Sequence, residues 1–290
     1  MSIKTAMNIA FLGMGLMGSR MSVRLLDAGF AVSVWNRTAN AVEPLIAKGA
    51  NDLTNLEHIS SFQIIAMCLA NDEAVQFVAQ PLLAKIQPHQ IIIDFSSSSV
   101  ELTQKLATQA HAKGAHWIDA PVSGGVMGAE QGTLVIFAGG DADMIQQLAP
   151  FFAPLSQRVT HMGKSGSGQA TKICNQLIVA ATSTLIAEAI ALAEKSGVDT
   201  TLLAPALAGG FADSKPFQIL APRMATQNFE PVQWKVQTLE KDLTNAINLA
   251  TTHGLTLPVA DRALQQLNKH AKNGFSAQDL SSIIKVIESP

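Results

Sequence analysis

Short apolar runs alternate with stretches of helical spacing through the first half of the chain. The runs that predict strands are Asn8–Leu12, Ala31–Trp35, Gln63–Leu69, Ile91–Phe95, Trp117–Ile118 and Thr133–Ala138. Between the first two, Leu16–Ala28 has helical spacing and stops at Gly29, the residue type that a left-handed C-cap favours. Strands that alternate with helices are typical of a parallel sheet covered by helices on both faces, so the pattern predicts a doubly wound α/β domain.

The pattern changes near Gly163. Glycines at 163, 166 and 168 lead into a long apolar pattern from about Gln169 to Lys195. This pattern predicts a helix that is apolar on most faces, so we expect it to be surrounded by partners and to run between domains. The rest of the chain predicts helices separated by glycine and proline, with almost no strand signal. We therefore expect an α/β domain over residues 1–163 and an all-α domain over residues 164–290, joined by the long interdomain helix.

Composition adds the expectation of an oligomer. The 290 residues are 48% hydrophobic and only 14% charged, against about 25% charged in an average soluble domain, so we expect much surface to be buried between domains or subunits. The net charge of −2 provides no basic field for phosphate backbones or anionic lipid, and neither nucleic acid nor a membrane is an expected partner. The most apolar stretch, Leu177–Ala193, is interrupted by Thr182, Ser183, Thr184 and Glu188, which favours a buried helix over a membrane span.

Cysteine and tyrosine usage exclude several chemistries. The 2 cysteines are too few for a disulfide framework or a four-thiolate zinc site, so we expect no metal. They fit a reducing compartment, and we expect a cytoplasmic protein. The chain has 0 tyrosines, which excludes mechanisms that use a phenol as proton donor, including the Tyr-x-x-x-Lys pair of short-chain dehydrogenases.

A G-x-G-x-x-G motif follows the first predicted strand and opens the first predicted helix. In this context the first glycine permits the tight turn, the second lets the backbone approach a pyrophosphate, and the third allows close helix packing. Glycines in any tight strand-to-helix turn are the alternative, but the strand, helix and second strand together favour dinucleotide binding in a Rossmann-type domain. The residues assigned to the cofactor are Gly13, Met14, Gly15, Leu16, Met17 and Gly18, with Leu69 and Ala70 at the end of a later strand.

The end of the second predicted strand favours NADP over NAD. An NAD site usually has Asp or Glu about 20 residues beyond the first glycine, to bind the adenosine ribose. Here that region contains Asn36, Arg37 and Thr38 and no carboxylate. Arg37 can pair with a 2′-phosphate, and Asn36 and Thr38 can donate to it; an arginine exposed in a loop is the alternative.

Two further segments suggest a substrate site. Ser123, Gly124 and Gly125 follow another strand, and open parallel sheets bind ligands beyond the carboxyl ends of their strands. A hydroxyl beside two glycine N–H groups can hold a carboxylate, although a turn with only a structural role is the alternative.

Lys172 lies at the start of the long helix, with Asn175 and Gln176 three and four residues later on the same face. Burial lowers the pKa of a lysine toward neutrality, which suits a proton donor to a developing alkoxide. A lysine that extends its charged end from an interdomain helix to water is the alternative. Cys174 has no histidine in its motif, so we interpret it as a small core residue of the helix and not as a nucleophile.

These segments, in this order, resemble the β-hydroxyacid dehydrogenase family, which includes 3-hydroxyisobutyrate dehydrogenases, tartronate semialdehyde reductases and glyoxylate/succinic semialdehyde reductases. The resemblance covers essentially the whole chain. It implies an N-terminal Rossmann domain, an all-helical C-terminal domain, a cleft for NAD(P) and a short acid, and a homodimer or homotetramer.

The resemblance also assigns roles to single residues. It implies that Ser123, Gly124 and Gly125 bind the substrate carboxylate and that Lys172 and Asn175 are catalytic. The remaining positions that match the family are Ser97 in a cofactor loop, Trp234 in the substrate pocket, Lys241 on the cofactor side and Asp242 in support of the site.

One position departs from the family pattern. Gln176, which we assign to substrate binding, stands where many members carry a second asparagine. This pair resembles the tartronate semialdehyde reductase branch, which more often has an acidic NAD-type residue after the second strand. The segment with Gly209, Gly210 and Ser214 lines the substrate pocket in relatives, although the sequence alone would predict turn residues there.

The predicted activity is an NAD(P)-dependent oxidoreductase that interconverts a short β-hydroxy or 2-hydroxy acid and its semialdehyde or oxo acid. NADP(H) is preferred, with NAD possible, and Lys172 is the general acid and base. An imine reductase of the same fold is one alternative, against which Lys172 argues because those enzymes usually carry Asp or Tyr there. A non-catalytic NADP-binding scaffold is another, and a decarboxylating 6-phosphogluconate dehydrogenase would need a much longer helical domain.

Overall fold

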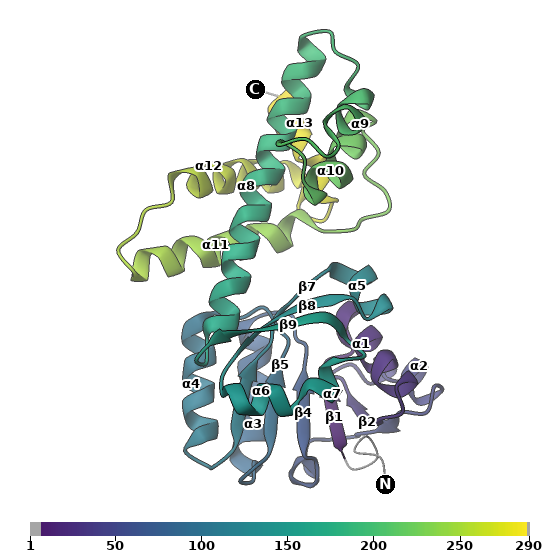
Figure 1. The fold of residues 1–290 in the computed structure, drawn as a ribbon, viewed down its shortest axis with the longest axis vertical. Coiled ribbons are helices and arrows are strands. Elements are labelled where there is room, and N and C mark those ends of the chain that lie inside the picture. Colours follow the sequence, from purple (N-terminus) through teal and green to yellow (C-terminus); the bar gives the residue numbers. More distant parts are fainter. Residues whose placement is uncertain (1–6, 289–290) are drawn as a thin grey trace. The chain divides into compact units, whose positions relative to one another are not determined.

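The computed structural model describes residues 7–288, and the chain divides into two compact units (Figure 1). The first unit ends at Lys172 and the second begins at Ile173. The predicted domain boundary after residue 163 stays a prediction.

The first unit is built on one sheet with the strand order β3-β2-β1-β4-β5-β6-β8-β7, and β9 pairs with β8. The strands are β1 (Asn8–Leu12), β2 (Ala31–Trp35), β3 (Asn51–Asp52), β4 (Ile64–Met67), β5 (Ile91–Asp94), β6 (His116–Asp119), β7 (Val122–Ser123), β8 (Leu134–Gly139) and β9 (Ser156–Gly163). Neighbours from β3 through β6 are parallel, whereas β8 is antiparallel to β6 and β7. The order from β3 to β6 is that of a dinucleotide-binding sheet, which confirms the doubly wound α/β prediction.

Helices cover both faces of this sheet because successive side chains of a strand point to opposite faces. In β1, Ile9 and Phe11 join the core cluster that includes side chains of α1 and α7, whereas Ala10 and Leu12 join the cluster that includes side chains of α3 and α4. The helices of this unit are α1 (Leu16–Asp27), η2 (Ala39–Ala41), α2 (Glu43–Ile46), η3 (Ile59–Ser61), α3 (Asp72–Lys85), α4 (Val100–His111), α5 (Gly125–Gln131), α6 (Ala142–Gln147) and α7 (Ala149–Phe152).

The end of α1 shows how local sequence sets this architecture. Gly29 has φ of +87°, its N–H donates to Leu26 O, and the Phe30 N–H donates to Leu25 O. These are the hydrogen bonds of a Schellman C-cap, which glycine favours because the left-handed backbone costs it no Cβ clash. The chain then enters β2 beside β1, as the sequence predicts.

The second unit is helical, which confirms the predicted all-α region. Its elements are α8 (Ser167–Lys195), which begins in the first unit, η4 (Thr200–Leu202), α9 (Leu203–Leu207), α10 (Lys215–Ala225), α11 (Val236–Thr252), α12 (Pro258–His270), the π-helical η5 (Ala271–Phe275), η6 (Leu280–Ile283) and α13 (Ile284–Glu288). Between residues 173 and 288 the only β pairing is a single bridge between Lys235 and Asp279.

The long helix α8 also bears on the membrane question. It is the one helix within residues 7–288 that is long and apolar enough to cross a membrane, judged by length and composition only. The core helix of a soluble protein passes the same test. The expectation that α8 is a buried helix and not a membrane span stays a prediction.

Candidate active site

The glycine loop between β1 and α1 contains glycines of two kinds. Gly13 has φ of +98°, and a Cβ there would overlap the carbonyl oxygen of Cys68 and lie 2.7 Å from the Leu69 side chain. A Cβ on Gly18 would overlap the carbonyl oxygen of Gly13. The protein's own packing therefore requires glycine at both positions.

Gly15 differs from both of these glycines. Its backbone has φ of −75°, which any residue can adopt, and a Cβ there would meet nothing within 4 Å. Gly15 is exposed and is the N-cap of α1, with no side chain capping the helix. Because the first N–H groups of a helix favour anions, this open end fits a phosphate of the predicted dinucleotide.

Asn36 fixes the glycine loop to the end of β2. The Met14 N–H donates to Asn36 Oδ1 at 2.9 Å, and Asn36 Nδ2 donates to the carbonyl oxygen of Thr38 at 3.0 Å. Both polar ends of this side chain thus hold the chain itself, while Arg37 and Thr38 are exposed. Of the three residues predicted to select the cofactor, Arg37 carries the charge that a 2′-phosphate needs.

The neighbouring strands β4 and β5 bring more predicted cofactor residues to the same edge of the sheet. The Leu69 N–H donates to Ser96 Oγ at 2.9 Å, and the Ser96 N–H donates to Asp94 Oδ1 at 2.9 Å. Leu69 and Ser97 are half-buried, and Ala70 is exposed. Because these strands are parallel to β1, the loops that follow them lie at the same carboxyl edge as the glycine loop.

The Ser123 loop lies beyond β6, at the start of α5. Gly124 and Gly125 have φ of +131° and +63°, conformations that L side chains rarely adopt. Both glycines are exposed and Ser123 is half-buried. A Cβ on Gly125 would meet nothing within 4 Å, so the backbone there is unobstructed, as carboxylate binding would need.

Lys172 lies near the start of α8 and is 9% exposed. Asn175 Nδ2, one turn further on, donates to Gln176 Oε1 at 2.8 Å. Gln176 Nε2 donates to Asp242 Oδ2 at 2.5 Å, and Lys241 Nζ lies 3.4 Å from Asp242 Oδ1. The structure thus brings together four of the predicted site residues in one network of the second unit.

Trp234 is held separately within the second unit. Its backbone N–H donates to Asp279 Oδ2 at 3.2 Å, and its backbone carbonyl oxygen accepts from the Leu280 N–H at 2.8 Å. The side chain is half-buried. Asp279, which the sequence reasoning missed, therefore fixes the backbone at the predicted substrate-pocket residue.

Three buried polar residues of the first unit were also missed, namely Asp119, Gln169 and Asp94. Asp119 Oδ1 accepts from the Gly166 N–H at 2.8 Å, and its Oδ2 accepts from the Gln169 N–H at 3.0 Å. Burial raises the pKa of Asp119, and the N–H donors partly oppose this. The third is Asp94, whose pKa burial raises to about 7; its Oδ2 has no hydrogen-bond partner in the described part of the chain. A carboxylate at a strand end was the available signal for both aspartates.

The two cysteines do not form a thiol site. Burial, with a smaller contribution from Asp94, raises the pKa of Cys68 to about 12, so the thiol stays protonated at neutral pH. Cys174 is free and exposed, so the expectation of a core position was wrong: residue 174 lies on the side of α8 away from the buried neighbours Ile173 and Gln176. Over residues 7–288 there is no group of three or more His, Cys, Asp or Glu side chains that could hold a metal ion.

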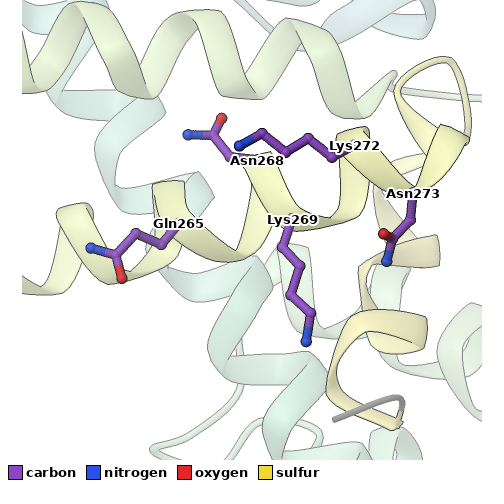
Figure 2. A pocket seen from close by; sticks show the side chains of 5 residues that line it. All are labelled: Gln265, Asn268, Lys269, Lys272 and Asn273. Carbon is purple, nitrogen blue, oxygen red and sulfur yellow. The ribbon is translucent and has the colours of Figure 1, made fainter.

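Figure 2 shows a surface depression on α12 and η5 that contains none of the predicted residues. It is lined by Gln265, Asn268, Lys269, Lys272 and Asn273. In this view Lys272 extends toward Asn268, whereas Lys269 points to another side of the helix (Figure 2).

Comparisons with known proteins cover nearly the whole chain. Residues 8–163 match the family described as the NAD binding domain of 6-phosphogluconate dehydrogenase. Residues 166–287 match the family described as NAD-binding of NADP-dependent 3-hydroxyisobutyrate dehydrogenase. The 2-hydroxy-3-oxopropionate reductase of Escherichia coli (strain K12) is 32% identical over 286 residues, which cover 97% of each chain.

Solved structures show the same relationship. The 3-hydroxyisobutyrate dehydrogenase of Mycobacterium tuberculosis, solved with L-serine, has a TM-score of 0.90 at 29% identity and covers 98% of this chain and 99% of its own. An imine reductase from Pseudomonas sp. has a TM-score of 0.63 at 20% identity, covering 97% of this chain and 99% of its own. Likeness at that identity shows a shared fold alone.

Proposed function

Because the chain belongs to the β-hydroxyacid dehydrogenase family of NAD(P)-dependent oxidoreductases, we propose that it interconverts a short 3-hydroxy or 2-hydroxy acid and the corresponding semialdehyde or oxo acid. Its relatives are oxidoreductases that act on CH–OH groups. Among them, one is named for 2-hydroxy-3-oxopropionate and another was solved with L-serine, both short carboxylates. A short carboxylate is therefore the substrate class that we propose here.

The observation that carries this proposal is the placement of buried Lys172 relative to the glycine loop. Asp119, at the carboxyl end of β6, binds the N–H groups of Gly166 and Gln169 at the start of α8. This anchors the helix with Lys172 to the sheet edge at which the glycine loop and the Ser123 loop lie. A dinucleotide loop, a carboxylate loop and a buried lysine at one edge are the groups that hydride transfer to an oxo acid needs.

Each group then has one task. The open N-terminus of α1 at Gly15 binds the phosphates of the cofactor, and the Ser123 loop orients the substrate through its carboxylate. NADPH, when bound, supplies the hydride to the carbonyl carbon. The Lys172 ammonium donates a proton to the oxygen as it gains negative charge, which yields the hydroxy acid. In the reverse direction, neutral Lys172 accepts the hydroxyl proton.

Preference for NADPH rests on Arg37. The loop after β2 exposes this guanidinium and holds no Asp or Glu at residues 36–38, while Asn36 is engaged in fixing the glycine loop. A guanidinium binds phosphate oxygens through charge-assisted hydrogen bonds, whereas the ribose of NADH offers only hydroxyls.

Assembly into a homo-oligomer is supported by an apolar stripe on α8. Ile178, Leu185 and Leu192 recur every seven residues and are 66%, 64% and 69% exposed. A seven-residue apolar repeat suits helix pairing between subunits.

The free cysteines support a reducing, cytoplasmic location.

The proposal is tested by following oxidation of NADPH and of NADH in parallel with glyoxylate, succinic semialdehyde, tartronate semialdehyde and methylmalonate semialdehyde. Turnover of one of these with NADPH is the expected result, and the corresponding hydroxy acid should reduce NADP⁺. Turnover of a cyclic imine with every acid silent would instead support the imine reductase alternative. Cofactor binding without turnover of any acid or imine would support a non-catalytic scaffold.

A further inference from the structure

Two buried side chains with no part in the proposed chemistry hold the first turns of α8. Asp119 accepts hydrogen bonds from the Gly166 and Gln169 N–H groups at 2.8 and 3.0 Å. The space around it admits no larger residues, because a Cβ on Gly139 would lie 2.6 Å from Asp119 Oδ1 and one on Gly168 would lie 2.8 Å from Oδ2. The carboxylate is thus enclosed by glycine backbone and fixes where the helix begins.

Gln169 joins the same turn to the loop after β5. It is 0% exposed; its Nε2 donates to the Ser96 carbonyl oxygen at 2.8 Å, and its Oε1 accepts from the Ser98 N–H at 3.1 Å. These two bonds bracket Ser97, the predicted cofactor contact. The Ser96 hydroxyl in turn accepts from the Leu69 N–H, so a second predicted cofactor residue is tied to the same loop.

Gln169 precedes Lys172 by three residues and shares its side of α8. On the basis of the proposed function, we propose that Asp119 and Gln169 are positioning residues, which set the Lys172 ammonium in register with the cofactor loop around Ser97. They act through the backbone and touch neither substrate nor cofactor. A displacement of about 1 Å at the reacting groups is enough to cost about 10²-fold in rate.

The side chain at 169 must both donate and accept to make its hydrogen bonds to Ser96 and Ser98. It donates to a carbonyl oxygen and accepts from an N–H at the same time, and of the common isosteres only a protonated carboxyl can also do both. Gln169→Glu therefore retains the acceptor for Ser98 but, when ionised, turns an oxygen toward the Ser96 carbonyl. Lowering the pH protonates the introduced carboxyl and restores the donor.

The first unit offers a matched control in Gln90. This glutamine is 5% exposed; its Nε2 donates to the carbonyl oxygens of Ile59 and Phe62, and its Oε1 accepts from the Gln87 N–H. It is the same kind of buried amide bridge, but it lies before β5 and not after it, at the opposite end of the strand from Ser96. Gln90→Glu therefore introduces a similar buried charge without touching the loop or α8.

The experiment measures kcat and the KM for NADPH for the wild type, Gln169→Glu and Gln90→Glu from pH 6 to pH 9, with thermal melts to confirm that each protein is folded. At pH 8 we expect Gln169→Glu to lose at least about 10-fold in kcat and to bind NADP⁺ more weakly by calorimetric titration. Both defects should shrink as the pH falls, because the neutral carboxyl donates to Ser96 O. The charged groups near the introduced carboxyl are Asp72, Asp94, Asp119 and Lys172.

A kcat for Gln169→Glu no lower than that of Gln90→Glu, or a defect that is independent of pH, would overturn the inference. Failure of the proposed function looks different, because the wild type itself would then reduce no substrate. In that case the calorimetric titration still tests whether Gln169 positions the Ser97 loop. If it does, Gln169→Glu weakens NADP⁺ binding more than Gln90→Glu does. Equal affinities of the two variants for NADP⁺ would refute the inference.

Discussion

At the scale of single residues, Asn36 and Arg37 show how neighbours divide two tasks. Both polar ends of Asn36 bond to the chain's own backbone, at Met14 and Thr38. Arg37 is exposed beside it. The sequence predicts both as cofactor ligands; because Asn36 is engaged within the chain, we propose Arg37 as the residue that selects the phosphate.

Arg37→Ala should raise the KM for NADPH by about 10-fold or more, because hydrogen bonds to a charged partner contribute about 1.5–3 kcal/mol. The KM for NADH should change little, since that cofactor has no 2′-phosphate. Steady-state kinetics with both cofactors measure the ratio. Arg158→Ala, at an exposed arginine of β9 in the same unit, is the control. Equal changes for NADPH and NADH would show that Arg37 does not bind the 2′-phosphate.

At the scale of elements, the glycine loop separates the demands of folding from those of binding. A Cβ on Gly18 overlaps the protein's own backbone, whereas one on Gly15 meets nothing within 4 Å. Gly15 also has an ordinary extended backbone conformation. Packing therefore does not require glycine at this position, and we propose that the bound cofactor does.

Gly15→Ala should leave the thermal midpoint nearly unchanged and weaken NADP⁺ binding, because the added methyl occupies the space of the phosphates. Gly18→Ala should destabilise the first unit by about 1–3 kcal/mol or more, since overpacking against backbone has no flexible neighbour to yield. Thermal melts and calorimetric titrations on both variants test the pair. A Gly15→Ala protein that binds NADP⁺ as the wild type does would argue against a phosphate site at α1.

Elements with local patterns could be predicted from the sequence. The bounds of β1 and β2 are as expected, and Gly29 caps α1 as its position indicates. The two-residue strands β3 and β7 carry no periodicity, and β9 is a mostly exposed strand without an apolar alternation, so none was predicted.

The candidate site divides in the same way. The glycine, Ser123 and Lys172 segments are each local motifs. Asp119 and Gln169 are not, because their bonds join residues 47 to 73 positions apart in the sequence. Only the fold brings those partners together; the position of Asp119 at the end of a strand was a local signal, and Gln169 had none.

At the scale of the whole molecule, the two units contain buried titratable groups with opposite effects on stability. In the first unit, burial raises the pKa of Asp94 from 3.8 to about 7. In the second, burial and then the charge of Lys285 lower the pKa of His270 from 6.5 to about 4. His270 Nε2 lies 2.7 Å from Ser282 Oγ, and its ring stacks on Phe275.

These shifts predict opposite pH dependences. From about pH 4 to pH 7 folded Asp94 holds a proton that the unfolded chain has lost, so this group's contribution to the free energy of unfolding falls as the pH rises. From about pH 4 to pH 6.5 the unfolded chain holds a proton that folded His270 lacks, so its contribution rises with pH. Each slope is at most about 1.4 kcal/mol per pH unit.

Differential scanning calorimetry between pH 5 and pH 7 tests this pair with two variants. Asp94→Asn should gain stability relative to the wild type as the pH rises, and His270→Gln should gain relative to the wild type as the pH falls. Differences from the wild type that stay constant with pH would contradict the assignment of these slopes to Asp94 and His270.

The central claim, that Lys172 is the acid and base of an NADPH-dependent reductase, is tested most directly by turnover of Lys172→Ala on the substrate that the wild type reduces fastest. The account predicts a loss of about 10²-fold or more in kcat with NADP⁺ affinity nearly unchanged, because the lysine acts on the substrate oxygen. Cys174→Ala, at an exposed position of the same helix, should keep wild-type turnover. Full turnover by Lys172→Ala would contradict the account.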